Sequence, residues 1–354
     1  MDQQYYVDYV SSGHADDTEC AMTVLRGHTK FSISAKYSQV TGTYFHEQLV
    51  QRVKKSREYP FGKCPPHLSP ADLLYQHCLP SLKHITPDTT LQDLSLESLF
   101  HAPTYDLHLI REANDQDVRV EGLDTCAYTP AFNMSPIPIT SLPASSQTLP
   151  RFHTSQLQIC PAQDASKSLD WIQGAVRTRD GEEMYFKPRY SLREADFERE
   201  LHILTRIAAD GLHDKIRVPK ISGVVVSDDA DGDGDDEEGI CVGMLLTLIP
   251  GRHLADPALH EKVVVHEKWG KQVTSTVREL HANGIVWGDV NPMNVMIDEQ
   301  MDAWVIDFGG MNNVEFVDDE LRETVDGDWQ GVGRLFGAWL PRKVGSEVGS
   351  SAEY

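Results

Sequence analysis

The sequence predicts an α+β protein in which a β-rich segment is followed by a mainly helical one. Short stretches with strand patterning gather between residues 151 and 250, where one amphipathic helix interrupts them. A long helical pattern and a small hairpin follow between residues 251 and 340. The chain has 354 residues and 40% of them are hydrophobic, so it is long enough to bury a substantial core. Residues 1–129 come first, as an extension of uncertain α/β structure.

The β-rich segment contains five predicted strands. They are residues 155–160, 171–178, 182–188, 217–226 and 240–249. Asp180-Gly181 joins the second strand to the third, and this dipeptide is a strong hairpin signal. A helix is predicted between the third and fourth strands, because apolar residues recur there at steps of four, three and three. They are Phe197, Leu201, Leu204 and Ile207.

The helical segment begins with a predicted helix over about 257–282. Its apolar residues recur every three or four positions, as on one face of a helix. They are Val265, Trp269, Val273, Val277 and Leu280. Two short strands, 295–297 and 303–306, then flank a polar turn and predict a small hairpin.

The clearest candidate for a domain boundary is residues 130–150, which hold five Pro and four Ser and no charged residue. This composition predicts a linker. It separates an N-terminal accessory region of unknown role, 1–129, from a C-terminal domain at 151–340, with a tail at 341–354. Within the accessory region, partial alternation predicts strands in 21–36 and 105–120, and Pro70 opens a predicted helix over 70–83.

Charge and cysteine usage exclude some classes of partner. The formal net charge is −22, and residues 227–239 alone carry eight acidic side chains and no basic one. Nucleic acids and anionic membranes need a basic surface, so the sequence predicts neither as a partner. The six cysteines are scattered without a Cys-x-x-Cys pair. This usage favours reduced thiols and a cytoplasmic location, with the nucleus as the alternative.

The strongest chemical signal is the segment 287–310, WGDVNPMNVMIDEQMDAWVIDFGG. Asp289 is followed five residues later by Asn294 and eighteen residues later by Asp307, which begins Asp-Phe-Gly. This pattern resembles the catalytic loop and the Asp-Phe-Gly motif of the protein-kinase-like superfamily. It follows a long amphipathic helix, as it does in that family.

The resemblance implies a bilobal fold, with a small β-rich lobe at about 151–250 and a short, mainly helical C-lobe at about 251–340. It also implies ATP and Mg²⁺ as cofactors. Asp289 would orient the acceptor hydroxyl, while Asn294 and Asp307 would hold Mg²⁺ with oxygen ligands.

Two further residues follow from the same resemblance. Lys187 ends the third predicted strand and would contact the nucleotide phosphates. Its expected partner is Glu200 on the following helix, which stands in the register Phe-x-x-Glu-Leu-x-x-Leu. Glu194 and Glu198 are alternatives, but they are four residues apart and are expected to share a solvent-facing side of that helix.

The sequence departs from the protein-kinase pattern at several positions. Trp287-Gly288 replaces the usual His-Arg before the catalytic aspartate, and Asn291 replaces a lysine. No glycine occurs at 161–170, where a phosphate-binding loop is expected. The Gly-Asp pair also resembles the catalytic loop of aminoglycoside and choline phosphotransferases. With its N-terminal extension, the chain looks like divergent kinase-domain proteins of filamentous fungi.

The sequence therefore predicts an ATP-Mg²⁺-dependent kinase that transfers a phosphoryl group to a hydroxyl. The expected partners are ATP and an unknown acceptor, with a protein Ser or Thr side chain as the first expectation. Two alternatives stay open. One is a small-molecule kinase of the aminoglycoside or choline type. The other is a pseudokinase scaffold that binds nucleotide without transferring phosphate.

Overall fold

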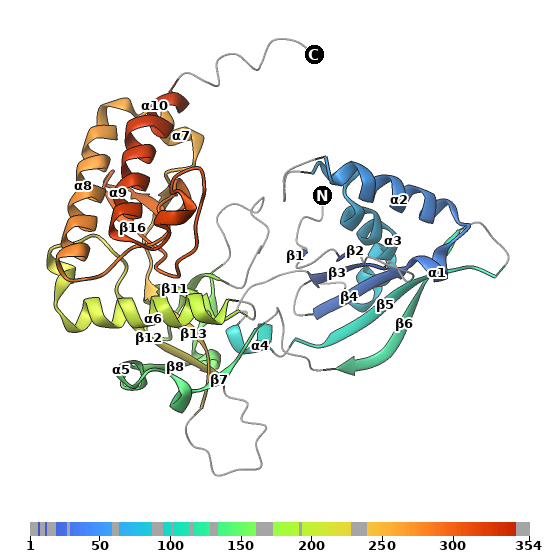
Figure 1. Ribbon diagram of the computed structural model, residues 1–354. Coiled ribbons are helices and arrows are strands. Elements are labelled where there is room, and N and C mark those ends of the chain that lie inside the picture. The colour runs from blue at the N-terminus through green and yellow to red at the C-terminus, as the bar shows by residue number, and fades with distance from the viewer. Residues whose placement is uncertain are drawn as a thin grey trace. The chain divides into compact units, whose positions relative to one another are not determined.

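The structure is a computed structural model that describes most of the chain (Figure 1). The described residues are 6–7, 11–12, 19–26, 29–58, 64–86, 95–100, 102–113, 117–127, 134–160, 173–190, 193–227 and 239–344. The chain forms two compact units. Unit 1 comprises Met1–Asn133 and Ser155–Gly174, and unit 2 comprises Met134–Thr154 and Ala175–Tyr354.

Unit 1 contains a mixed β-sheet in the order β1-β3-β4-β5-β6, with β2 pairing β3. Its strands are β1 (Tyr6–Val7), β2 (Ser11–Ser12), β3 (Glu19–Arg26), β4 (Thr29–Lys36), β5 (Thr104–Arg111) and β6 (Val118–Ala127). Strands β3 and β4 are antiparallel, and β4 runs parallel to β5. The strands predicted in 21–36 and 105–120 are therefore confirmed.

The helices of unit 1 lie between β4 and β5 in the chain. They are α1 (Tyr37–Val40), α2 (Tyr44–Ser56), η1 (Pro66–Leu68), α3 (Pro70–Ile85) and α4 (Leu96–Phe100). Helix α3 confirms the helix predicted at 70–83, since Ser69 caps it and Pro70 stands at its first turn. Helix α3 packs on β3 and β4, and its Leu74 is fully buried in the core of the unit. Strand β9 (Gln158–Ile159) and turn η3 (Thr154–Gln156) follow later in the chain.

Unit 2 contains a second sheet, in which the strand order is β8-β12-β13-β11-β10 and β7 pairs β13. Its strands are β7 (Ile137–Pro138), β8 (Arg151–His153), β10 (Gly174–Arg177), β11 (Glu183–Pro188), β12 (Ile221–Ser227) and β13 (Ile240–Thr247). A smaller sheet joins β14 (Gly251–His253), β15 (Val295–Asp298) and β16 (Ala303–Val305). These bounds confirm both hairpins that the sequence predicts.

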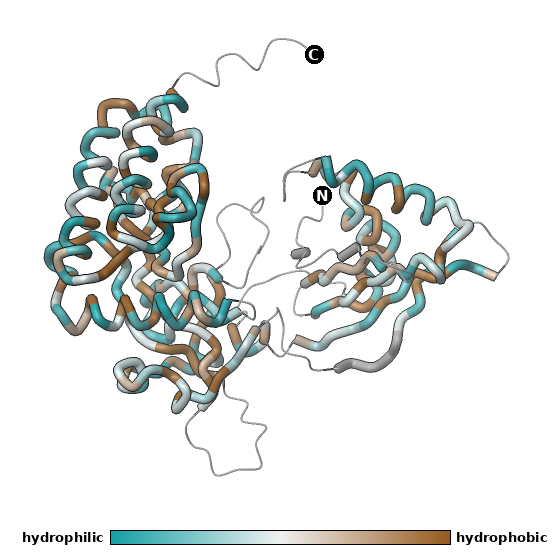
Figure 2. Tube along the Cα trace, viewed as in Figure 1, coloured by the Kyte–Doolittle hydropathy of each residue, from teal (hydrophilic) through white to brown (hydrophobic). Residues whose placement is uncertain are grey.

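The longer helices of unit 2, α6 (Glu194–Ala209) and α8 (Val263–Ala282), each bury an apolar face. The other helical elements are η2 (Ile139–Ser141), α5 (Ala144–Gln147), η4 (Leu212–Asp214), α7 (Pro257–His260), η5 (Pro292–Asn294), η6 (Asp319–Leu321), α9 (Val325–Arg334), η7 (Leu335–Trp339) and α10 (Leu340–Lys343). Helix α6 packs on β12, and α8 packs on α9 and β16 (Figure 1). Hydrophilic and hydrophobic residues alternate along these helices, as they do in amphipathic helices (Figure 2).

Three predicted segments differ from the structure. The strand expected over 155–160 is strand at β9 alone, because η3 occupies its start. The helix expected over 257–282 is two helices, because the Asp256 side chain caps α7 and the chain turns at Lys262 before α8 begins. The described part of the expected linker, 134–150, is also not extended. It forms β7, η2 and α5, and its Ile139 and Leu142 are buried in the core of unit 2. Apolar residues spaced among the prolines account for this packing.

The fold class is α+β, as the sequence predicts. No helix in the described residues has both the length and the apolar character needed to cross a membrane.

Candidate active site

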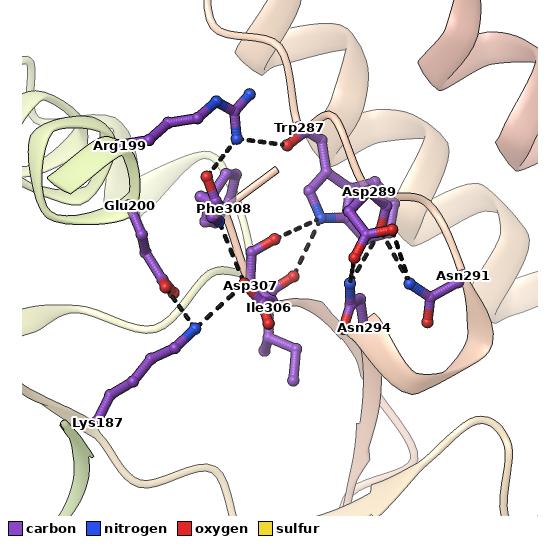
Figure 3. Close-up of polar contacts among 11 residues, drawn as sticks. Lys187, Arg199, Glu200, Trp287, Asp289, Asn291, Asn294, Ile306, Asp307 and Phe308 are labelled. Carbon is purple, nitrogen blue, oxygen red and sulfur yellow. Dashed lines mark hydrogen bonds and ion pairs between the residues drawn. The ribbon is translucent and has the colours of Figure 1, made fainter. Parts of the chain in front are cut away.

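Strand β11 and helix α6 bring together a partly buried lysine and a buried glutamate. The β11 residues Met184 and Phe186 point into the core, so the alternating pleat sends Lys187 to the opposite face. Glu200 lies on α6 and is 1% exposed. The Lys187 Nζ donates a hydrogen bond to Oε2 of Glu200 (Figure 3). The structure therefore places Lys187 against the glutamate that the sequence favours.

The same ammonium group also reaches the Asp-Phe-Gly segment. Lys187 Nζ lies 3.1 Å from Oδ1 of Asp307, whose side chain is 37% exposed. Asp307 has a φ of +60°, an unusual value for a residue with a side chain. This conformation places the carboxylate Oδ1 within 3.1 Å of both Lys187 and the backbone N–H of Gly309. Backbone strain at one residue thus holds a charge in a defined place.

The charges of this cluster shift one another's proton affinities. Burial lowers the pKa of Lys187, but Glu200 and Asp307 outweigh burial, and the net pKa is raised. Burial raises the pKa of Asp307, yet Lys187 and the Gly309 amide outweigh it and the net pKa is lowered. Glu200 shows the opposite balance, since burial dominates and its pKa is raised despite Lys187. At neutral pH the lysine is charged and Asp307 is ionised.

A second cluster forms around Asp289 in the loop before β15. Asn291 Nδ2 donates to Oδ1 of Asp289 at 3.0 Å, and Asn294 Nδ2 donates to Oδ2 at 2.7 Å. Burial raises the pKa of Asp289 and the charge of Asp307 adds to this, while the two asparagine hydrogen bonds lower it. The net pKa is raised, so Asp289 holds a proton more readily than an ordinary aspartate.

Trp287 connects the two clusters. Its ring is fully buried, and its Nε1 donates to the backbone oxygens of Ile306 at 3.0 Å and Asp307 at 3.2 Å. The residue that departs from the family pattern therefore ties the loop of Asp289 to the Asp-Phe-Gly segment (Figure 3).

Asp328 on α9 holds the backbone of the same loop. Its carboxylate is 1% exposed and accepts hydrogen bonds from the backbone N–H groups of Trp287 and Gly288, each at 2.8 Å. His281 Nε2 lies 2.7 Å from the same carboxylate. Asp328 is not the cap of α9, because Thr324 has that role. The contacts of Asp328 are those of a brace on the backbone of this loop.

The five residues that the sequence nominates for the site thus fall into two adjoining groups. Lys187, Glu200 and Asp307 form one cluster, while Asp289 and Asn294 form the other. Glu198, one of the two alternative partners for the lysine, accepts a hydrogen bond from Arg189 at 3.0 Å instead. The segment 161–170, where no glycine loop is found in the sequence, lies outside the described residues.

The sequence analysis missed Arg199, which stands on α6 immediately before Glu200. Its guanidinium donates to three backbone oxygens, those of Val286, Trp287 and Phe308. No spacing motif includes position 199, so the sequence gave no sign of this role.

The donor chemistry of the site fits Mg²⁺. Lys187 and Gly309 both bind Oδ1 of Asp307, so a cation would bind through Oδ2. The Asn294 Nδ2 donates to Asp289, so a cation would bind through the Asn294 amide oxygen. Carboxylate and amide oxygens suit this hard cation. Among the described residues, no group of three or more His, Cys, Asp or Glu side chains forms a complete metal site, so phosphate oxygens and water would complete the coordination.

Comparison with known proteins gives one partial similarity. The chain is 32% identical over 81 residues to the serine/threonine-protein kinase PKH2 of Candida albicans. The match covers 23% of this chain and 8% of the length of that kinase. No protein-family model matches the chain. The similarity supports a distant, kinase-like relationship over part of the chain.

Proposed function

We propose that the chain is an ATP-Mg²⁺-dependent phosphotransferase that moves the γ-phosphoryl group of ATP to an acceptor hydroxyl. The observation that carries the proposal is the joint arrangement of Lys187 with Glu200 and Asp307, beside Asp289 with Asn294. Phosphoryl transfer depends on positioning and on charge stabilisation rather than on covalent chemistry by the protein. A bilobal, kinase-like arrangement of unit 2 is part of this proposal.

Each side chain has a role that its contacts support. Lys187 is held charged by two carboxylates and would bind phosphate oxygens of ATP. Asp289 would orient the acceptor hydroxyl and accept its proton, for which its raised pKa is suited. Asn294 and Asp307 would hold Mg²⁺, which neutralises charge on the phosphates when bound. Glu200 keeps the lysine in place.

The acceptor class is the least determined part of the proposal. The partial similarity to a serine/threonine-protein kinase favours a Ser or Thr hydroxyl of a protein. The Gly288-Asp289 pair favours a small-molecule alcohol, because it resembles the loop of aminoglycoside and choline phosphotransferases. Turnover assays should therefore include a protein mixture, choline and an aminoglycoside as acceptors.

The decisive experiment measures Mg²⁺-dependent ATP turnover by the full chain. We expect Asp289→Asn and Asp307→Asn each to lower turnover by about 10²–10³-fold, since each removes a charge that acts on the transferred group. The matched control is Asp210→Asn, because Asp210 is a half-exposed aspartate that pairs with Arg206 at the end of α6. Wild-type turnover that equals that of both site variants would reject the proposal.

A second candidate function, a nucleotide-binding scaffold, is favoured by one feature. Both carboxylate oxygens of Asp289 already accept hydrogen bonds from asparagine side chains. One of these asparagines, Asn291, stands where protein kinases have a lysine. A thermal shift assay with ATP and Mg²⁺ tests this candidate, because a ligand that binds the folded state raises its stability. A shift without turnover for any acceptor would favour the scaffold. No shift at millimolar ATP would reject both functions.

A further inference from the structure

Arg199 is the side chain through which helix α6 contacts both loops of the candidate active site. It lies one residue before Glu200 on α6. Its Nη1 donates to the backbone oxygen of Trp287 at 3.2 Å and to that of Phe308 (Figure 3). Its Nη2 donates to the backbone oxygen of Val286 at 3.0 Å. The three acceptors come from two segments about twenty residues apart. One guanidinium therefore joins three parts of the site.

Gly288 leaves the space that this guanidinium occupies. A Cβ atom at position 288 would lie 2.7 Å from Nη2 of Arg199, which is closer than such atoms approach. Gly288 also has a φ of +87°, a conformation that favours glycine. The glycine that replaces an arginine in the family pattern thus makes room for an arginine from another element.

Arginine suits this position better than lysine does. Its planar guanidinium carries five N–H donors in a fixed fork, so it can serve several carbonyl oxygens at once. Lysine presents a compact ammonium group that cannot span the same three acceptors. The neighbouring residue, Glu200, faces Lys187. Consecutive residues of α6 therefore bind the catalytic-loop backbone and the phosphate-binding lysine.

We propose that Arg199 is a positioning residue that fixes α6 against the loop of Asp289 and the Asp-Phe-Gly segment, so that Glu200 stays paired with Lys187. Arg199 binds backbone oxygens, so its link between α6 and the two loops does not depend on phosphorylation of a side chain. The catalytic consequence rests on the proposed function, while the structural link does not.

The test compares Arg199→Met with Arg206→Met in the full chain. Arg206 is the matched control, because it lies on the same helix and also donates to a backbone oxygen, that of Asn283. Peptide-level hydrogen exchange gives a readout that requires no turnover. We expect Arg199→Met to speed exchange at 286–290 and 306–310 by about tenfold, since three hydrogen bonds are lost. Arg206→Met should leave both segments unchanged.

Turnover gives the second readout. We expect Arg199→Met to lower kcat by about 10²-fold with little change in KM for ATP, because misplaced reacting groups slow the chemical step. Arg199→Lys should recover only part of this loss. A merely structural role predicts instead that Arg199→Met and Arg206→Met lower the stability alike and change kcat alike.

Gly288→Ala tests the fit from the other side. It should speed exchange at 286–290 as Arg199→Met does, and the double variant should be little worse than either single one, since residues in contact are not additive. Full additivity, or exchange in Arg199→Met that matches the Arg206→Met control, would overturn the inference. A wild type without turnover would reject the proposed function, and the exchange experiment would still decide the role of Arg199.

Discussion

The two units place buried charge in different ways. In unit 1 the core is apolar, and the buried Arg26 donates its Nε to the backbone oxygen of Thr86 at 3.0 Å. In unit 2 the buried Glu200 and Asp328 bind partners from other elements of the unit. The described Arg26 contact joins the end of β3 to the residue after α3, whereas the Asp328 carboxylate has three described partners, in His281, Trp287 and Gly288.

Buried thiols behave alike in the two units, since burial also raises the pKa of Cys241 in the core of unit 2 to about 11. Cys20 and Cys78 lie in the core of unit 1, and burial raises the pKa of each to about 12. A thiol that stays protonated at neutral pH is a poor nucleophile and packs as a small apolar side chain. The buried thiols of both units therefore serve packing, and the difference between the units lies in their buried charges.

The largest expected effect is the loss of the Asp328 carboxylate. We expect Asp328→Ala to lower the free energy of unfolding of unit 2 by about 3–5 kcal/mol, because it strands two backbone N–H groups and His281 without their acceptor. Denaturant unfolding followed by tryptophan fluorescence measures this change, since Trp269 and Trp287 lie in the core of unit 2.

The matched variant in unit 1 is Arg26→Met, which removes a buried charge and its hydrogen bond to the backbone oxygen of Thr86. We expect it to cost about 1 kcal/mol, the usual net worth of a single hydrogen bond. Hydrogen exchange in β3 and α3 gives the stability of unit 1 separately. Equal costs for the two variants would remove the contrast between the units.

The next largest effect comes from the apolar core of unit 1. Leu74 is fully buried on α3, so we expect Leu74→Ala to cost about 3 kcal/mol through lost contacts and a cavity. Exchange in unit 1 should accelerate, while the Mg²⁺-ATP turnover proposed for unit 2 should keep its kcat. A parallel fall in kcat in a folded variant would show that the packing of unit 1 supports the site.

Much of the fold could be predicted from the sequence because its signals are local. Strand alternation, the Asp180-Gly181 turn and the helix start at Pro70 each depend on neighbours within a few residues. Three of the five nominated residues, Asp289, Asn294 and Asp307, could be nominated because a known spacing pattern joins them. Lys187 and Glu200 were nominated from a strand end and a helix register. The packing of the five residues into two adjoining clusters agrees with the spacing pattern.

The rest depends on contacts between segments far apart in the chain. Arg199 reads as an ordinary helix-surface residue until the carbonyl groups of Val286 and Phe308 are placed beside it. Trp287 reads as a departure from the family until its Nε1 is seen to bind two backbone oxygens. Composition likewise predicted a linker at 130–150, although Ile139 is buried in a core that local sequence does not reveal.

A smaller effect concerns the proton affinity of Asp289. Its pKa is raised by burial, and the Asn291 hydrogen bond opposes that rise. If Asp289 must be ionised to act, turnover falls as the pH drops through its pKa. We expect Asn291→Ala to move this acid limb to higher pH, because the opposing hydrogen bond is lost, and to change the plateau rate by less than about fivefold.

The control for that profile is Asn312→Ala. It also removes an amide hydrogen bond to a carboxylate, that of Asp319, at 2.7 Å. Its acid limb should coincide with that of the wild type. An Asn291→Ala limb that stays in place or moves to lower pH would contradict the assignment of Asp289 as the titrating base.

The smallest expected effect tests whether buried or merely abundant charge matters in unit 2. Residues 228–238 carry all eight acids of the acidic run and lie outside the described residues. The flanking strands β12 and β13 are antiparallel and pair Ser227 with Ile240, so a short glycine-containing turn can join them. We expect replacement of residues 228–238 by such a turn to change the free energy of unfolding by less than about 1 kcal/mol, since loop length has a weak effect on stability. A loss as large as that of Asp328→Ala would show that the run packs or binds within unit 2, and that buried partners alone do not explain how its charges act.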